Sequence, residues 1–557
     1  MNPPTHQRPR RPRTLVAAGL GILALLSSLA ALPAEAAPTA PAAPGPGPLP
    51  AAQAPPVATA QEAATAAYLH AIRRNPRLLR AFFRHLPKGG DLHHHLSGAV
   101  STEYLIELAA DDGLCIETGT MTAVAPPCGP GTRPAAEART DRAFHDAIVR
   151  AWSMQDFPPG GDGHDHFFAT FGKFGEVTRR HRGKQLAHVA NDVATQNQFS
   201  LETMVSPASE GAEALAAQVG RHTDPATLHR RLVAGGKLDR VVARAREEAD
   251  DTAAEFRAAA HCGTDRPAPA CHLPVRWISQ VSRGSSPERV FTQMALGMRL
   301  AERDPRFVAV NLVQPEDGDT ALRDYSLHMR MLKYLRGVYP KAHVTLHAGE
   351  LWPGLVKPAD LRFHIKEAVG TARAERVGHG VGLVHEDGWQ HTARTMAARE
   401  IAVEVPFSSN AQILGVRGAD HPFATYRSYG VPVVLATDDP GVSRIDISHE
   451  YQYAAETYGL SYRELKDLAR ASLEYAFLPG AGLWRGNPTR DGYGPVPACR
   501  DARPDGSRPP GADCRRLLDA SPKAAAQWRQ ETAFHRFERT FGTGRRPTAR
   551  PGGPLRP

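Results

Sequence analysis

Several features are scarce or missing in this 557-residue sequence, and each absence argues against a class of protein. None of its six cysteines are spaced as C-x-x-C, so a zinc site built from cysteines is the weaker interpretation of them. No glycine-rich phosphate loop is found, which argues against a dinucleotide-binding fold. The central part of the chain has no cluster of lysine and arginine, so we expect no nucleic-acid partner.

The positive charge of the chain lies mostly at its ends. The whole sequence has a formal net charge of +9. Residues 1–36 hold four arginines and one glutamate, and residues 542–557 hold four arginines, so only about +2 remains between these segments. The basic isoelectric point therefore says little about the partners of the folded part.

A long apolar run occurs at the N-terminus. Arginines precede a stretch from Leu15 to Leu32, which ends at Ala34-Glu35-Ala36. This order is typical of a secretory signal peptide, so we assign residues 1–36 to one and expect a secreted chain that leaves the membrane after cleavage. A transmembrane anchor is the alternative, because the run is almost long enough to span a bilayer. The Arg10-Arg11 pair also permits twin-arginine export.

The segments beside the folded part have a biased composition. Residues 37–60 are mostly proline and alanine with almost no charge, which predicts an extended linker. Residues 542–557 are predicted to be a disordered basic tail. Residues 61–541 remain for the folded domain, which is long enough to bury a large core.

The six cysteines fall into three pairs that are close in sequence. Each pair would close a loop rich in proline and glycine, and an exported chain can keep such bonds. We predict three local disulfides in insertions near residues 111–141, 255–273 and 485–518. The predicted pairs are Cys115 with Cys128, Cys262 with Cys271, and Cys499 with Cys514.

Short apolar, β-branched runs recur along the folded part, separated by stretches long enough for helices. They are the segment at Leu92 and residues 201–206, 275–281, 307–313, 343–347, 376–379, 401–407 and 433–437. Such runs argue for parallel strands in βα units. Eight of them predict an α/β fold, a (β/α)8 TIM barrel with N-terminal helices over residues 61–84 and disulfide-bearing loop insertions. An open doubly wound sheet is the alternative.

Polar side chains stand at the ends of four of these runs. His93 and His95 are two residues apart on an extended segment, so their imidazoles share one face. His347, His379 and Asp438 end three other runs. Because the working residues of a barrel lie at the carboxyl ends of its strands, these side chains are expected to meet.

These residues include candidate ligands for a catalytic metal site. His93, His95, His347 and Asp438 offer three imidazoles and one carboxylate, which suit a zinc ion that keeps a position for water. Iron, manganese and cobalt accept the same ligands. His94 points to the opposite face of the strand, where we expect it to pack rather than to bind metal.

The remaining polar residues are candidates for acid–base chemistry beside the metal. Glu350 follows His347 by three residues and is a candidate proton donor. His379 would orient the attacking oxygen or act as base, and Asp439 would accept a hydrogen bond from the nucleophile or from a heterocycle. Each has a structural alternative, since an Asp-Asp pair before Pro440 is often only a turn or a helix cap. Trp352 is expected to border the pocket.

Five stretches of the chain together resemble the signature motifs of the adenosine deaminase family. They are residues 87–98, His347-Ala348-Gly349-Glu350, Arg376-Val377-Gly378-His379-Gly380, Ser408-Ser409-Asn410 and Thr437-Asp438-Asp439-Pro440. The resemblance covers about residues 86–453. With a signal sequence and disulfide-bearing insertions, the chain is most similar to the secreted, growth-factor-related branch of the family.

The resemblance implies hydrolytic deamination of a purine nucleoside with one zinc ion per chain. Hydroxide would add to C6, Glu350 would protonate N1, and adenosine, or 2′-deoxyadenosine, would lose ammonia to give the inosine product. Zinc deaminases of the cytidine type use cysteine ligands in a P-C-x-x-C signature, which this chain lacks.

Two positions depart from the family pattern. Ser97 stands where many cytosolic members carry an aspartate that contacts the ribose, and Gln314 lies near a glycine that contacts the purine. With Trp352 and Asp439, these are the expected substrate-binding residues. Glu316 and Asp317 either face the substrate or cap the following helix.

Other functions share these features. The chain could deaminate adenine or another aminopurine, or bind a nucleoside as a signalling protein without useful catalysis. The sequence is also compatible with a homodimer.

Overall fold

The computed structural model of the chain describes residues 58–158 and 161–542. The predicted signal peptide, nearly all of the linker and nearly all of the tail lie outside these residues. Ala60, assigned to the linker, is the first residue of helix α1, and Gly542, assigned to the tail, is the last residue of helix α22. None of the described helices is both long and apolar enough to cross a membrane.

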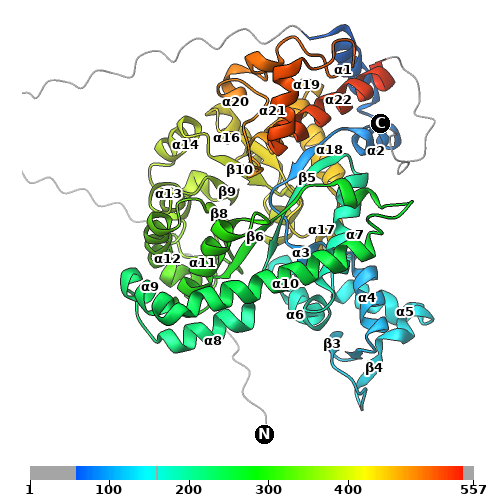
Figure 1. Cartoon of the computed structure of the whole chain (residues 1–557). Coiled ribbons are helices and arrows are strands. Elements are labelled where there is room, and N and C mark those ends of the chain that lie inside the picture. Colours follow the sequence, from blue (N-terminus) through cyan, green and yellow to red (C-terminus); the bar gives the residue numbers. More distant parts are fainter. Residues whose placement is uncertain (1–57, 159–160, 543–557) are drawn as a thin grey trace, which may run out of the picture. The chain divides into compact units, whose positions relative to one another are not determined.

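Eight parallel strands form the centre of the fold (Figure 1). They are β1 (Gly89–Asp91), β5 (Gln198–Val205), β6 (Val275–Ser282), β7 (Phe307–Val313), β8 (His343–Ala348), β9 (Arg376–His379), β10 (Ala402–Val405) and β11 (Val433–Leu435). Each strand pairs with the next in this order. The His95 amide donates to Asp438 O and the Asp438 amide donates to His93 O, both at 2.9 Å. The segments that directly follow β1 and β11 are therefore hydrogen bonded to each other, so the first and last strands of the barrel also meet. The predicted (β/α)8 barrel is confirmed, and the open sheet was the wrong alternative.

The strands are buried on both faces, which explains their nearly continuous apolar sequences. All seven residues of β7, FVAVNLV, are buried. A one-sided sheet would show alternation of apolar and polar residues instead. The few polar side chains inside the barrel are therefore conspicuous, and most of them belong to the site described below.

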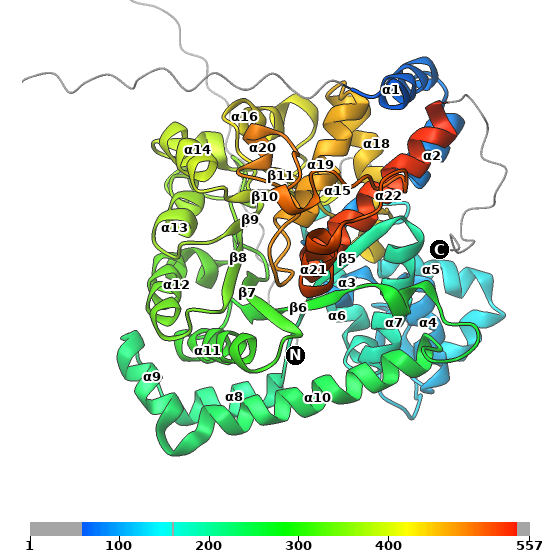
Figure 2. The same cartoon turned by 45° about the horizontal axis from the view of Figure 1, so that its top comes forward.

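Helices surround the barrel and connect its strands (Figures 1 and 2). Between β5 and β11 they are α8 (Ser209–Val219), α9 (Pro225–Val233), α10 (Lys237–Ala259), α11 (Pro287–Arg303), α12 (Asp319–Val338), α13 (His364–Gly370), α14 (Trp389–Ala398), α15 (Phe407–Ile413) and α16 (Phe423–Ser428). After β11 come α17 (Pro440–Ser443), α18 (Ile447–Thr457), α19 (Tyr462–Glu474), α20 (Pro488–Asp491), α21 (Ala512–Ala520) and α22 (Pro522–Gly542).

Two helices precede the barrel, as the sequence predicts. They are α1 (Ala60–Ile72), capped by the Thr59 hydroxyl, and α2 (Pro76–His85), capped by Asn75. Phe82 of α2 packs edge-on against Phe537 and Phe541 of α22. Helix α2 and the last described helix, α22, are therefore joined by an aromatic cluster.

The long connection from β1 to β5 holds most of the additional structure. It contains α3 (Leu96–Ala99), α4 (Thr102–Asp111), a small antiparallel sheet, α5 (Arg142–Ala151), α6 (Gly163–Thr178) and α7 (Arg182–Thr195). The small sheet consists of β2 (Cys115–Glu117), β3 (Thr122–Val124) and β4 (Thr132–Pro134).

The structure contains the three local disulfides. Cys115–Cys128 ties β2 to the loop before β4, Cys262–Cys271 joins the end of α10 to a 3-10 turn at Pro269–His272, and Cys499–Cys514 joins a second such turn, Pro497–Cys499, to α21. Free cysteines are absent from the described residues.

Candidate metal centre and active site

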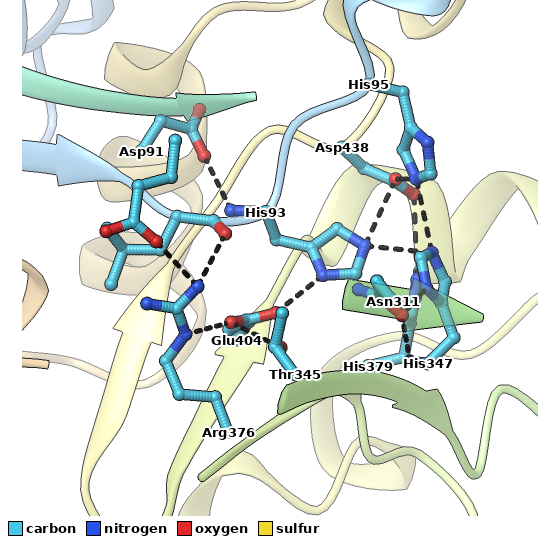
Figure 3. Close-up of polar contacts among 12 residues, drawn as sticks. Asp91, His93, His95, Asn311, Thr345, His347, Arg376, His379, Glu404 and Asp438 are labelled. Atoms are coloured by element: carbon cyan, nitrogen blue, oxygen red, sulfur yellow. Dashed lines mark hydrogen bonds and ion pairs between the residues drawn. The ribbon is translucent and has the colours of Figure 1, made fainter. Parts of the chain in front are cut away.

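Four histidines and an aspartate converge at the carboxyl ends of the barrel strands (Figure 3). The Nε2 atom of His347, in β8, lies 3.0 Å from that of His93 and 3.2 Å from that of His95. Asp438 Oδ1 lies 3.4 Å from His93 Nε2 and 3.2 Å from His95 Nε2. Residues separated by more than 340 positions in sequence therefore place four donor atoms around one point.

The hydrogen bonds behind these rings turn their free nitrogens inward. His93 Nδ1 donates to Glu404 Oε2 at 2.7 Å, and His347 Nδ1 donates to Asn311 Oδ1 at 2.9 Å. In neutral rings the facing Nε2 atoms then both carry lone pairs. Two acceptors 3.0 Å apart repel each other unless a cation lies between them. Ligand atoms about 2.0–2.1 Å from a tetrahedral zinc ion lie about 3.3 Å apart, so this donor set fits a divalent cation.

The charges of the cluster favour a cation as well. Burial and the neighbouring His93 hold the pKa of His347 well below its usual value, which keeps this ring neutral. Burial opposes a charge on His93, yet Asp438 and Glu404 raise its pKa to about 10. A positive charge between His93 and these carboxylates is therefore stabilised, and a bound metal ion would supply that charge in place of a proton.

A buried ion network lies beneath the cluster (Figure 3). Arg376, in β9, donates to Glu404 at 2.5 Å and pairs with Glu202 at 2.8 Å. Thr345 donates to Glu404 Oε1 at 2.9 Å. Glu404 is therefore fixed on one side and holds His93 on the other, which orients a ligand through a partner outside the ligand set. The sequence did not predict a role for Glu404, because no neighbouring residues distinguish a functional carboxylate within a buried strand from any other glutamate.

Glu350 lies next to the cluster and is buried. Its Oε1 is 3.7 Å from His379 Nδ1. Burial raises the pKa of the Glu350 carboxyl, and the Asp438 charge adds to this effect. A raised pKa favours the protonated form of the carboxyl, which suits a group that donates a proton.

His379 stands beside the ligands rather than among the closest ones. Its Nε2 lies 3.8 Å from Asp438 Oδ2 and has no hydrogen-bond partner among the described residues. Its Nδ1 contacts Asn410 Oδ1 at 2.8 Å, and Asn410 in turn contacts His421. Asn410 therefore orients the His379 ring so that Nε2 faces the centre. The sequence identified Asn410 only as part of the Ser408-Ser409-Asn410 motif and did not predict this role.

Asp439 does not act as a helix cap. It precedes α17, but its side chain makes no capping hydrogen bond, and its buried Oδ1 is unpartnered within residues 58–158 and 161–542. Gly98 packs against this carboxyl so closely that a Cβ there would lie 1.8 Å from Oδ1. Burial and the adjacent Asp438 raise the pKa of Asp439 well above its usual value. Asp439 therefore keeps a buried carboxyl oxygen available for a hydrogen bond with a substrate or a nucleophile, and its role as an acceptor stays a prediction.

The other expected substrate residues are placed less centrally. Ser97 is half-buried on α3, next to Gly98. Gln314 adopts a φ of 80°, and its Oε1 accepts a hydrogen bond from the Gly284 amide at 2.9 Å. Trp352 is half-buried and packs edge-on against His385, with ring centroids 5.0 Å apart. Their contacts with substrate remain predictions.

His94 packs as expected. Its Nδ1 contacts the Thr203 hydroxyl at 2.9 Å, and burial lowers its pKa to about 3. It borders a separate cavity of about 290 Å³ together with Asp91 and Gln198. That cavity is lined by none of the metal-cluster residues, so it is not the candidate active site.

Glu316 and Asp317 fit neither alternative drawn from the sequence. Glu316 is fully buried and accepts hydrogen bonds from the amides of Gly349 and Glu350. Asp317 forms an ion pair with His164 of α6 at 3.1 Å. Neither residue caps α12 with its side chain.

The fold and the site together define a class of protein. It is a (β/α)8 barrel with a candidate site for one metal ion, built from histidines and an aspartate at the carboxyl ends of the strands. Residues 231–482 match the model of the adenosine deaminase family. This match, the relatives described next and the motifs that meet in the site show that the chain is similar to the adenosine deaminase family over this part of its length.

Curated relatives match a limited part of the chain. An adenosine deaminase of Salmonella typhimurium (strain LT2) is 38% identical over 137 residues, which are 24% of this chain and 38% of the relative. An adenosine deaminase of Salmonella newport is 37% identical over the same length. The matched region thus spans about two fifths of the length of these relatives.

Two solved structures align with more of the chain. The Arabidopsis N6-mAMP deaminase has a TM-score of 0.48 and 21% identity, covering 72% of this chain and 96% of its own. An adenine deaminase from Arthrobacter aurescens has a TM-score of 0.41 and 16% identity, covering 71% and 94%.

Proposed function

We propose that the protein is a secreted, zinc-dependent hydrolytic deaminase that converts adenosine, and 2′-deoxyadenosine, to the inosine product and ammonia. The convergence of three imidazoles and the Asp438 carboxylate, with the buried Glu350 carboxyl beside them, carries the proposal. The similarity to the adenosine deaminase family supports the reaction type, and the donor set supports zinc.

The residues of the site divide the reaction between them. A zinc ion held by His93, His95, His347 and Asp438 would supply a water that loses its proton near neutral pH. Glu350 gives its proton to N1 of the purine as the water oxygen bonds to C6. The C6–amino bond then breaks, and the amino group leaves as ammonia with the second proton of the water. The first proton lost by the water restores Glu350.

His379 and Asp439 position the reacting groups. His379 presents Nε2 toward the attacking oxygen, either to orient it or to take its proton. The Asp439 carboxyl forms a hydrogen bond with the purine ring, and its raised pKa favours the protonated form, which would donate to a ring nitrogen. These two contacts hold the C6 atom near the water.

A free aminopurine such as adenine is the second candidate substrate. Ser97 has a short side chain where many relatives are expected to hold the ribose with an aspartate, and Gln314 is engaged with Gly284. These observations favour weaker recognition of the sugar. A nucleoside-binding protein without catalysis is disfavoured, because Glu350, His379 and Asp439 all lie at the centre.

The proposal is tested by ammonia release from zinc-loaded protein. Adenosine, 2′-deoxyadenosine and adenine are compared at matched concentrations, with and without a chelator. We expect the highest kcat/KM for a nucleoside and loss of activity with the chelator. A preference for adenine would select the second candidate. No ammonia from any aminopurine would refute both.

A further inference from the structure

The segment His347–Glu350 links a proposed metal ligand to the proposed proton donor within four residues. Strand β8 ends at Ala348, and Gly349 then turns the chain with a φ of 73°. A Cβ at Gly349 would lie 2.6 Å from Ile365, so the turn is tightly enclosed. The amides of Gly349 and Glu350 have left the sheet ladder and require other partners, because a buried amide without a hydrogen bond destabilises the fold.

A single carboxylate provides both partners. Glu316 Oε1 accepts from the Gly349 amide at 3.1 Å, and Glu316 Oε2 accepts from the Glu350 amide at 2.8 Å. On the other side of the turn, Arg283 donates to the carbonyl of His347 at 3.3 Å. The backbone of the metal ligand and that of the proton donor are therefore held by one Glu–Arg pair.

The pair is itself anchored by separate elements. Glu316 Oε1 forms an ion pair with His364 of α13 at 2.5 Å, and Arg283 Nη1 lies 3.8 Å from Glu316 Oε2. Arg283 also donates to Leu312 O at 2.9 Å, and Tyr325 stacks on His364 with ring centroids 3.7 Å apart. The side chains of Arg283, Glu316 and His364 are at most 1% exposed.

We propose that Glu316 is a positioning residue for deamination: it fixes the backbone of Gly349 and Glu350 so that the Glu350 carboxyl reaches the substrate nitrogen. The inference rests on the proposed function and deepens it. Glu316 acts through two backbone amides and touches neither substrate nor metal. Arg283 and His364 balance its charge and hold it in place.

The carboxylate of Glu316 also acts on Glu350 through space. Burial opposes its ionisation, but His364 and Arg283 lower its pKa, so it remains charged. That negative charge contributes to raising the pKa of Glu350. Removing it should therefore lower the pKa of Glu350 and move the loss of activity at high pH to a lower pH.

Glu316→Gln tests the proposal, because the amide keeps the shape but loses the charge and one acceptor oxygen. In the zinc-loaded variant we expect kcat to fall by about 10- to 100-fold, as for partners that orient catalytic groups, with KM nearly unchanged and metal content retained. In the pH profile of kcat, the fall in activity at high pH should begin at a lower pH than in the wild type. Peptides covering residues 347–352 should exchange amide hydrogens faster than in the wild type.

Glu386→Gln is the matched control. Glu386 is also buried and also accepts from two consecutive amides, those of Ile365 at 2.5 Å and Lys366 at 2.8 Å, but outside the catalytic segment. Burial raises its pKa to about 8, so the amide replaces a carboxyl that is largely neutral. This variant should keep kcat, the pH profile and the exchange of residues 347–352.

The outcomes separate the inference from the proposed function. Wild-type kcat and an unshifted pH profile in folded, zinc-loaded Glu316→Gln would overturn the positioning role, as would an equal fall in kcat for Glu386→Gln. If Glu316→Gln does not fold, His364→Gln should show the same selective loss of kcat, and wild-type kcat there would overturn the role instead. If the wild type releases no ammonia, the proposed function fails. The amide hydrogen exchange of residues 347–352 then still tests whether Glu316 holds the backbone of this turn.

Discussion

The carboxyl groups of the site differ in charge although all are buried, and their neighbours decide the difference. Asp438 accepts a hydrogen bond from the Ser409 hydroxyl at 2.7 Å and lies beside His93 and His95, and its pKa is well below the usual value despite its burial. For Asp439 and Glu350, burial dominates and raises the pKa of each carboxyl. The site therefore combines an ionised candidate ligand with two carboxyls whose raised pKa favours the protonated form.

The first prediction concerns the proton donor. Glu350→Gln should leave the zinc content unchanged, because the four proposed ligands remain, and should lower kcat by about 10²- to 10⁴-fold, because the transferable proton is gone. Metal analysis and steady-state kinetics on the same preparation check both parts. Full activity of the variant would show that another group protonates the purine.

The second prediction concerns the ligand set. His347→Ala removes the imidazole that lies closest to both His93 and His95, so the purified protein should bind little or no zinc. His94→Gln is the control, because His94 faces Thr203 and not the cluster, and it should retain the metal. Metal analysis after dialysis distinguishes them, and full occupancy in His347→Ala would argue against its role as a ligand.

At the scale of elements, the inserted region between β1 and β5 is tied to loops at the carboxyl end of the barrel. The Met154 amide donates to Val442 O at 2.8 Å, just after β11. Gly163, the first residue of α6, packs against the Gln412 carbonyl, and His164 pairs with Asp317 beyond β7. Met154 and the start of α6 therefore contact connections that follow three different strands.

The third prediction is that this attachment depends on pH. The ion pair with Asp317, and then Asp165, raises the pKa of His164 to about 9, although burial opposes the charge. The attachment is thus fully present below the ordinary histidine pKa of about 6.5 and is lost as the pH rises through about 9. Amide exchange of the first turn of α6 should be slower in the wild type than in His164→Gln at pH 6. A difference that persisted unchanged above pH 10 would contradict the ion pair.

At the scale of the whole molecule, three disulfides stabilise loops far from the metal cluster in sequence. They close loops with separations of 13, 9 and 15 residues. In the chain-entropy description, a loop of this size contributes about 3 kcal/mol to the free energy of unfolding. The bonds therefore favour the folded state without taking part in the reaction.

The fourth prediction follows for the reduced protein. Gentle reduction of all three bonds should lower the Tm measured by thermal unfolding, while the zinc content of the remaining folded protein is retained. Peptide mapping under non-reducing conditions should recover only the three local pairs. A cross-linked peptide joining Cys115 to Cys514 would contradict the local pairing.

Much of the architecture could be predicted from the sequence because it depends on local order. Runs such as 307–313 and 343–347 are apolar over the length of a strand, and βα alternation leaves parallel pairing as the natural arrangement. Residues that directly follow such runs lie at the carboxyl end of the barrel, so the meeting of His95, His347 and Asp438 followed from their positions alone.

The supporting residues depended on tertiary structure. Glu404 and Arg376 lie within strands, Glu316 and Arg283 lie in loops, and nothing beside them in sequence distinguishes a buried charge from a solvated one. Their roles arise because the closed barrel brings opposite charges from distant strands into a space without water, where each must find a partner. The sequence by itself determined the strands, their order and the reactive groups at their ends. Only the closed barrel decided which charges hold those groups in place and in which direction the pKa of each carboxyl shifts, because both depend on burial and on contacts between residues far apart in the chain.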